Sequence, residues 1–171
     1  MKSEWVTPPE LFHKAGSELP ISGSALLELV KAILTRDMPV RFRALGSSME
    51  PFIKSGDVIT VAPLHKHHPR IGEVVAFIHP ESNKLVVHRV VAKKDDALFI
   101  QGDSSHNFPD GFVSKENLIG SVTHLWREGR KVWLGLGPER LLIAFLSRRG
   151  WLISLRNRLV QLKNSFLGNR N

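Results

Sequence analysis

The chain has 171 residues and a globular composition, with 42% hydrophobic and 23% charged residues. This composition excludes a disordered chain, a coiled coil and a collagen-like repeat, and the length fits one domain with a small appendage. Cysteine is absent, so disulfides, thiolate metal sites and cysteine nucleophiles are excluded.

The net charge of +8 is concentrated at one end of the chain. Residues 1–126 hold 14 Lys and Arg against 14 Asp and Glu, whereas residues 127–171 hold ten basic residues against Glu128 and Glu139. Such a localised field predicts contact with something anionic, for example a membrane surface, a nucleic acid or an acidic partner.

No stretch of the sequence is predicted to cross a bilayer or to act as a secretory signal. The longest apolar run, Leu141–Leu146, is far shorter than the roughly 20 residues of a spanning helix. The first 20 residues are acidic and contain several prolines, unlike a signal peptide. We therefore expect a protein that is cytoplasmic or peripheral to the membrane.

Residues 1–39 are predicted to form an irregular segment followed by one short helix. The helix would be capped by Ser22 or Ser24 and run to about Asp37, because leucine, isoleucine and valine recur at helical spacing from residue 26 to residue 34. Pro39 would end it.

From Val40 the pattern changes to short β-rich pieces separated by turn-forming residues. The predicted strands are Val40–Ala44, Asp57–Ala62, Glu73–Ile78, Leu85–Ala92, Ala97–Gln101, Leu118–Leu125 and Arg130–Leu134. Short strands without long helices between them favour a mainly β fold, with an antiparallel barrel-like or sandwich-like domain over residues 40–135.

Residues 136–171 are predicted to form two basic amphipathic helices broken near Gly150. Leucine and phenylalanine keep near-heptad spacing from Leu141 to Phe166, and basic residues interleave with them. The apolar stripe would either pack on the β domain, with the arginines in solvent, or lie in the interface of an anionic membrane.

The segment LGSSMEPFIKSGDVITV, residues 45–61, is the first candidate for chemistry. It places a Gly-Ser-Ser turn after a strand, then a helix-like turn from Met49, then a Gly-Asp turn into the next strand. A serine at this junction, Ser48, presents its hydroxyl to solvent beside outward-pointing backbone N–H groups. A nucleophile with an oxyanion hole requires that geometry.

Further blocks follow in order: GEVVAF at 72–77, VVHRVV at 86–91, QGDSS at 101–105, then Pro109-Asp110 and LIGSV at 118–122. Over about residues 40–126, their order and spacing resemble the catalytic domain of type I signal peptidases, in which a Ser-Met-x-Pro motif carries the nucleophile. The chain is similar to the histidine branch of that family, from archaea and the endoplasmic reticulum, because His88-Arg89-Val90 stands where the bacterial branch has a lysine base.

The resemblance implies a serine endopeptidase with a signal-peptidase-like β domain, which cleaves an extended peptide after small residues. Ser48 would be the nucleophile and His88 the general base, a role that imidazole fulfils at neutral pH. Asp110 is the better match for the acidic residue that orients the imidazole. Asp103, in the Gly-Asp turn, is the alternative, although that aspartate more often holds the loop.

The resemblance also bears on the oxyanion hole and on partners. The Ser48 backbone N–H would hold the oxyanion. Gly46 stands where the histidine branch often supplies a second donor, a hydroxyl, and either Ser47 or a backbone N–H could take its place. No metal or organic cofactor is implied. The expected partners are a protein or peptide substrate and, through the tail at residues 138–171, an anionic membrane surface, rather than nucleic acid.

Other functions remain open. A self-cleaving regulator similar to the repressor-type peptidases would cut a bond such as Ala15-Gly16, upstream of Ser48. Against it, the base in those proteins is lysine, and residues 1–14 are too short for a DNA-binding helix-turn-helix. A non-catalytic peptide-binding module would keep the fold without turnover.

Overall fold

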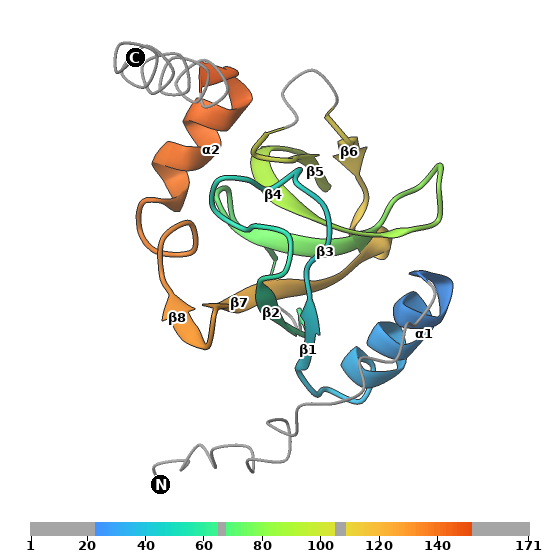
Figure 1. Ribbon diagram of the computed structural model, residues 1–171. Coiled ribbons are helices and arrows are strands. Elements are labelled where there is room, and N and C mark those ends of the chain that lie inside the picture. Colours follow the sequence, from blue (N-terminus) through green and yellow to red (C-terminus); the bar gives the residue numbers. More distant parts are fainter. Residues whose placement is uncertain (1–22, 65–67, 105–108, 152–171) are drawn as a thin grey trace, which may run out of the picture.

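The structure is a computed structural model that describes residues 23–64, 68–104 and 109–151. Its elements in chain order are α1 (Gly23–Leu34), β1 (Val40–Arg43), β2 (Val58–Ala62), β3 (Val74–Ile78), β4 (Leu85–Lys94), β5 (Ala97–Gln101), β6 (Gly111–Val113), the 3-10 helix η2 (Lys115–Asn117), β7 (Leu118–Arg127), β8 (Arg130–Val132) and α2 (Arg140–Arg148). The predicted mainly β class, with antiparallel strands and short helices, is confirmed (Figure 1).

The described strands form one eight-stranded antiparallel sheet in the order β1-β2-β7-β3-β4-β5-β6, with β8 also paired to β7. Strand β7 joins the two halves of the sheet because it pairs with both β2 and β3. Gly120 permits this close crossing: a Cβ at that position would lie only 2.4 Å from a methyl group of Val61. A larger residue there would push β2 and β7 apart.

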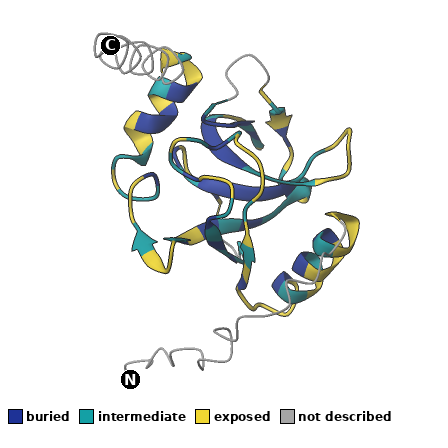
Figure 2. Cartoon of the chain, in the orientation of Figure 1, coloured by how far each residue is buried: buried dark blue, intermediate teal, exposed yellow. Residues whose placement is uncertain are grey.

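Strand β3 lies between two apolar clusters, one on each of its faces. It is accordingly buried along most of its length (Figure 2). Successive side chains of a strand point to opposite faces, so Val74 and Ala76 pack in one cluster while Val75 and Phe77 pack in the other. Helix α1 covers the first cluster with Val30 and Leu34. The helix is therefore part of the same folded unit as the sheet.

Differences from the predicted elements lie at their ends and at β6. Strands β4 and β7 each run two residues further than predicted, and α1 ends at Leu34, three residues before Asp37. Strand β6 was not predicted. Its three residues are too few to show an alternating pattern, and it exists because it pairs with the exposed edge of β5.

In the predicted tail, α2 confirms the first helix, and Gly150 has a φ of 70°, which only glycine adopts at little cost. The second predicted helix lies outside the described residues. Ile143, Ala144 and Ser147 are buried where α2 meets the sheet, and the Gln101 side chain donates a hydrogen bond to the Ser147 carbonyl. No helix among residues 23–64, 68–104 and 109–151 is long and apolar enough to span a membrane.

Candidate active site

Ser48 lies at the start of a tight turn that follows β1. Gly46 has a φ of 95°, a left-handed conformation that lets the chain reverse there. The Ile53 N–H then donates to the Met49 carbonyl (3.0 Å), and both of these side chains are buried. The turn is thus anchored in the core, while the half-buried Ser48 stays at its rim.

The same turn is anchored at its far end by an ion pair. Both carboxylate oxygens of Asp57 accept hydrogen bonds from the Arg127 guanidinium, at 2.8 and 2.7 Å. Burial acts to raise the pKa of Asp57, but hydrogen bonds from Arg127 and from the Lys54 backbone outweigh it, so that the pKa is lowered. Arg127 also donates to the Phe52 carbonyl. The segment that carries Ser48 is therefore fixed at both ends.

His88 lies in β4, opposite Val75 of β3, and is nearly buried. Its Nε2 is 2.7 Å from the Ser48 hydroxyl oxygen, and its Nδ1 is 2.5 Å from Oδ2 of Asp110. A carboxylate only accepts hydrogen bonds, so Nδ1 carries the proton and Nε2 accepts from the Ser48 hydroxyl. This tautomer is the one that a general base needs.

Asp110 immediately precedes β6, so the pairing of β6 with β5 places its carboxylate beside His88. The other oxygen of Asp110 lies 3.9 Å from Nε2 of His79. His79 was not among the candidates from the sequence. It follows Phe77 by two positions at the end of β3, and both His79 and His88 lie beside the Phe77 ring, with centroids 6.4 and 6.3 Å away. The alternation of β3 was the signal that could have found it.

Asp103, the other candidate, pairs with Arg89 instead of His88. The Arg89 Nε and Nη2 atoms donate to its two carboxylate oxygens at 2.8 and 2.7 Å, and both side chains are fully buried. Arg89 Nη1 also donates to the carbonyls of Gly72 and Gly135. The structure thus brings Ser48, His88 and Asp110 together and gives Asp103 a place among structural contacts.

Ser104 orients the backbone around Ser48. Its hydroxyl donates to the Ser47 carbonyl (2.7 Å), and its N–H donates to the Ser48 carbonyl (2.8 Å). In a trans peptide the N–H points opposite to the preceding carbonyl, so the bond to the Ser47 carbonyl directs the Ser48 N–H the other way. Within the described part of the chain, that N–H has no acceptor. It is free to donate to a ligand.

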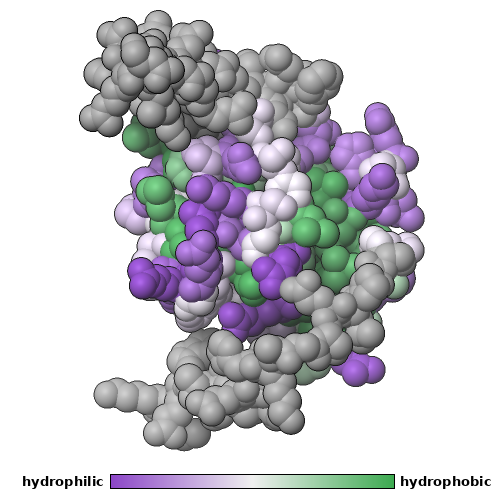
Figure 3. All heavy atoms as spheres, in the orientation of Figure 1, coloured by the Kyte–Doolittle hydropathy of each residue, from purple (hydrophilic) through white to green (hydrophobic). Residues whose placement is uncertain are grey.

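Ser48, His88 and Asp110 line a cleft of about 810 Å³. Apolar side chains form most of its remaining wall: Leu26, Phe42, Ala44, Leu45, Met49, Ile53, Ile59, Leu85, Val86 and Val87. Figure 3 shows a broad apolar surface on this face of the molecule, near the start of β4. The cleft combines a polar reacting end with an apolar floor.

Two strand edges border this cleft. Among the strands that the structure describes, β1 is the first of the sheet and pairs with β2 alone. On the other side, β4 pairs with β5 only from Arg89 onward, so residues 85–88 have a strand partner on the β3 side alone among the described residues. The outer edge of a β-strand is a template for an added strand, and such an edge lies at each border of the cleft.

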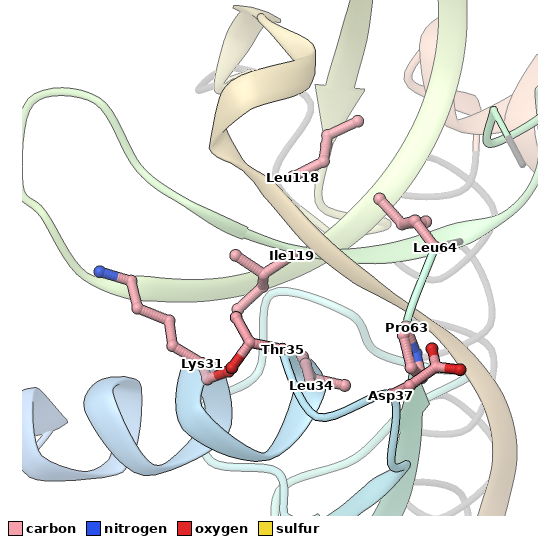
Figure 4. A pocket seen from close by; sticks show the side chains of 8 residues that line it. All are labelled: Lys31, Leu34, Thr35, Asp37, Pro63, Leu64, Leu118 and Ile119. Atoms are coloured by element: carbon pink, nitrogen blue, oxygen red, sulfur yellow. The ribbon is translucent and has the colours of Figure 1, made fainter. Parts of the chain in front are cut away.

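A smaller hollow of about 360 Å³ lies between α1 and the start of β7 (Figure 4). Lys31 and Asp37 are its charged residues, and Leu34, Leu118 and Ile119 supply apolar wall. It contains none of the candidate catalytic residues. The described residues contain no group of three or more His, Cys, Asp or Glu side chains that could hold a metal ion. The larger cleft is therefore the candidate site.

Comparison with known families identifies a match over most of the β domain. The model of the Peptidase S24-like family matches residues 21–123, which include Ser48, His88, Asp103 and Asp110. A search of curated proteins found no match. The family includes signal peptidases and self-cleaving repressors, and although most members are serine peptidases, some are non-catalytic.

Proposed function

Because the chain belongs to the Peptidase S24-like family, we propose that it is a serine endopeptidase with a Ser-His mechanism. Ser48 is the nucleophile, His88 is the general base and Asp110 orients the imidazole. One observation carries the proposal: a hydrogen-bonded chain runs from the Ser48 hydroxyl through His88 to Asp110. The histidine base relates the chain to the histidine branch of the signal peptidases.

The reaction proceeds by acyl transfer. His88 Nε2 takes the proton of the Ser48 hydroxyl as the oxygen attacks the scissile carbonyl, and it then gives that proton to the leaving amine. In the second half of the reaction, water attacks the acyl group in the same way, with His88 as the base, and releases it from Ser48. Asp110 stays ionised and stabilises the imidazolium that forms at each step.

The negative oxygen of the tetrahedral intermediate is held by the Ser48 backbone N–H. Its orientation by Ser104 supports this role, because a donor that is already directed at the oxyanion needs no reorganisation. Gly46 supplies no side-chain donor. Ser47 is the hydroxyl nearest in sequence for a second hydrogen bond.

The substrate is an extended peptide that lies in the cleft between the edges of β1 and β4. Backbone pairing with these edges provides affinity, and the apolar floor reads alternate side chains. A peptide in this position passes Ser48 and His88 at one end of the cleft. Small residues on the acyl side of the scissile bond allow the backbone to approach Ser48 closely.

The test is a cleavage assay on the full chain with mass-spectrometric readout. Wild type, Ser48→Ala and His88→Ala are incubated with precursor proteins that carry signal sequences, and Ser55→Ala, at an exposed serine that is not part of the proposed site, serves as a matched control. We expect cleavage after small residues, lost by at least about 10⁴-fold in the Ser48 and His88 variants. Labelling of Ser48 by a fluorophosphonate reports the activated serine without any substrate.

If the folded protein shows neither cleavage of the substrates nor labelling of Ser48, that result contradicts the proposal and favours a peptide-binding module. Loss of activity in Ser48→Ala but not in His88→Ala would contradict the assignment of the base.

A second candidate function is self-cleavage. Gly23, Ser24 and Leu26 line the cleft, so the segment that precedes them in the chain is joined to the cleft wall. Ala15-Gly16 is within about 25 Å of extended chain from Gly23. Self-cleavage would produce a new N-terminus at Gly16 at a rate independent of protein concentration, and Ser48→Ala would abolish it. Cleavage that accelerates with protein concentration would instead indicate attack between molecules.

A further inference from the structure

We propose that the β8–α2 surface, defined as the exposed side chains of residues 130–151, binds an anionic lipid membrane. The inference does not depend on the proposed peptidase activity, because it rests on residues outside the cleft. The segment includes β8, the loop that follows it and α2, which lies at the opposite side of the sheet from α1 (Figure 1).

Large apolar side chains are unusually exposed on this surface. They are Trp133, Leu134, Leu141, Leu142, Phe145 and Trp151. Trp133 is 67% exposed, and Leu141 and Leu142 are each 60% exposed. Helix α2 already buries Ile143, Ala144 and Ser147 against the protein. An ordinary surface helix has a polar outer face, whereas α2 presents a second set of apolar side chains outward.

Basic residues belong to the same segment as these apolar side chains. Arg130, Arg148 and Arg149 are exposed, and Lys131 is half-buried. The only acidic residues from 128 to 151 are Glu128 and Glu139. The Glu139 carboxylate accepts hydrogen bonds from the backbone N–H groups of Gly135 and Gly137. The charge available to a partner is therefore positive, which complements anionic headgroups.

The cations lie directly beside the aromatic rings. The Lys131 ammonium is 4.0 Å from the centre of the Trp133 ring, and the Arg149 guanidinium is 4.6 Å from that of Phe145. Trp151 packs edge-on against Phe145. In a membrane interface, aromatic rings lie at the boundary of the acyl chains while neighbouring cations reach the phosphates. The paired rings and cations of this surface fit these two levels of the interface.

Other occupants fit this surface less well. A nucleic acid would satisfy the arginines but leave Leu141 and Leu142 in water. A second copy of the chain would cover the leucines but bring like charges together. Only an anionic bilayer offers apolar chains and phosphates side by side.

Binding at this surface would affect the position of the cleft. Helix α2 is held to β5 by the hydrogen bond from Gln101 to Ser147, and Ser104, three residues after Gln101, donates to Ser48. These contacts attach both the helix and the turn that carries Ser48 to the end of β5. Membrane binding by α2 would therefore keep the domain that carries the cleft close to the bilayer.

The experiment is vesicle co-sedimentation of the full chain. One set of vesicles contains equal amounts of phosphatidylcholine and phosphatidylglycerol, and the other contains phosphatidylcholine alone. We expect sedimentation with the anionic vesicles, weakened by added salt, and a blue shift of tryptophan fluorescence on binding. The Ser48→Ala variant should bind equally, which separates this result from the fate of the proposed peptidase activity.

Two variants test the apolar and the charged parts of the surface separately. Leu141→Ser with Leu142→Ser should weaken binding by at least tenfold. Arg148→Gln with Arg149→Gln should weaken it by about fivefold for each arginine. The matched control is Lys93→Gln with Lys94→Gln, an adjacent exposed pair on β4 outside this surface, which should bind like wild type. Thermal melting checks that each variant is folded.

Four results would overturn the proposal. The first is no sedimentation of the folded wild type with anionic vesicles. The second is equal binding by wild type and both surface variants. The third is a dimer in sedimentation velocity that the leucine variant dissociates, which would make a second copy the occupant. The fourth is loss of vesicle binding by competition with substoichiometric RNA, which would make nucleic acid the preferred ligand.

Discussion

His88 and Arg89 are neighbours in β4, and each pairs with an aspartate from the segment that joins β5 to β6, yet the two pairs have opposite environments. The Arg89–Asp103 pair is fully buried, and its remaining donors bind backbone carbonyls of Gly72 and Gly135. The His88–Asp110 pair keeps 11% and 9% of its side chains exposed and lies in the cleft wall beside Ser48. A buried pair whose hydrogen bonds are all made inside the protein holds the fold. A pair that borders a cleft, such as His88–Asp110, can exchange a proton with a group in that cleft.

The largest expected effect distinguishes the two aspartates by activity. Replacing Asp110 by Asn keeps its size but removes the charge that stabilises the His88 imidazolium. We expect peptidase activity to fall by roughly 10⁴-fold, with little change in melting temperature because the carboxylate borders the cleft. Steady-state kinetics and a melting curve measure both quantities, and an Asn variant with near wild-type activity would remove Asp110 from the mechanism.

The converse variant, Asp103→Asn, should act on stability. It leaves the Arg89 charge buried without its counterion, which costs about 3–5 kcal/mol of unfolding free energy and lowers the melting temperature by roughly 10 °C or more. Replacing the pair together, by Arg89→Met with Asp103→Leu, should recover part of the loss because no unpaired charge remains. An Asp103→Asn protein as stable as wild type would contradict this account of the pair.

Arg127–Asp57 is a third pair, in which the aspartate is buried and the arginine side chain is 30% exposed, and it sharpens the comparison through pH. The pKa of Asp57 is lowered in the folded state, so the pair stabilises the fold above the unfolded pKa of about 3.9. That stabilisation is lost as the pH falls through the folded value. Arg127→Gln should lower the free energy of unfolding by roughly 1.5–3 kcal/mol at pH 7. The difference in stability between this variant and wild type should shrink below about pH 4. Melting curves from pH 7 to pH 3 measure this, and a difference that stays constant would refute the linkage.

The smallest expected effect concerns Ser104, which follows Asp103 but orients the Ser48 backbone. Ser104→Ala removes the hydrogen bond to the Ser47 carbonyl and keeps the N–H bond to Ser48. We expect kcat to fall about tenfold, at the level of one neutral hydrogen bond, with KM and melting temperature nearly unchanged. Ser104→Thr retains a hydroxyl and should restore much of the rate. A change confined to KM would instead place Ser104 in substrate binding.

The sequence by itself determined the order of elements, because alternating apolar residues in short segments and turn-forming residues between them are local signals. It also singled out Ser48, His88, Asp103 and Asp110, whose residue types and spacing do not depend on the fold. Strand β6 was missed because it is too short to carry a pattern, and it forms only against β5.

Only the tertiary structure decided how these candidates pair. Asp103 and Asp110 lie seven residues apart in one connecting segment, so their spacing in the sequence did not decide which of them contacts His88. The pairing of β6 with β5 places Asp110 in the cleft, and the burial of Arg89 requires Asp103 as its counterion. His79 likewise meets Asp110 only because β3 and β4 are neighbours in the sheet. Such contacts join residues far apart along the chain, and the physical reason for them, burial of charge in a packed sheet, exists only once the sheet has formed.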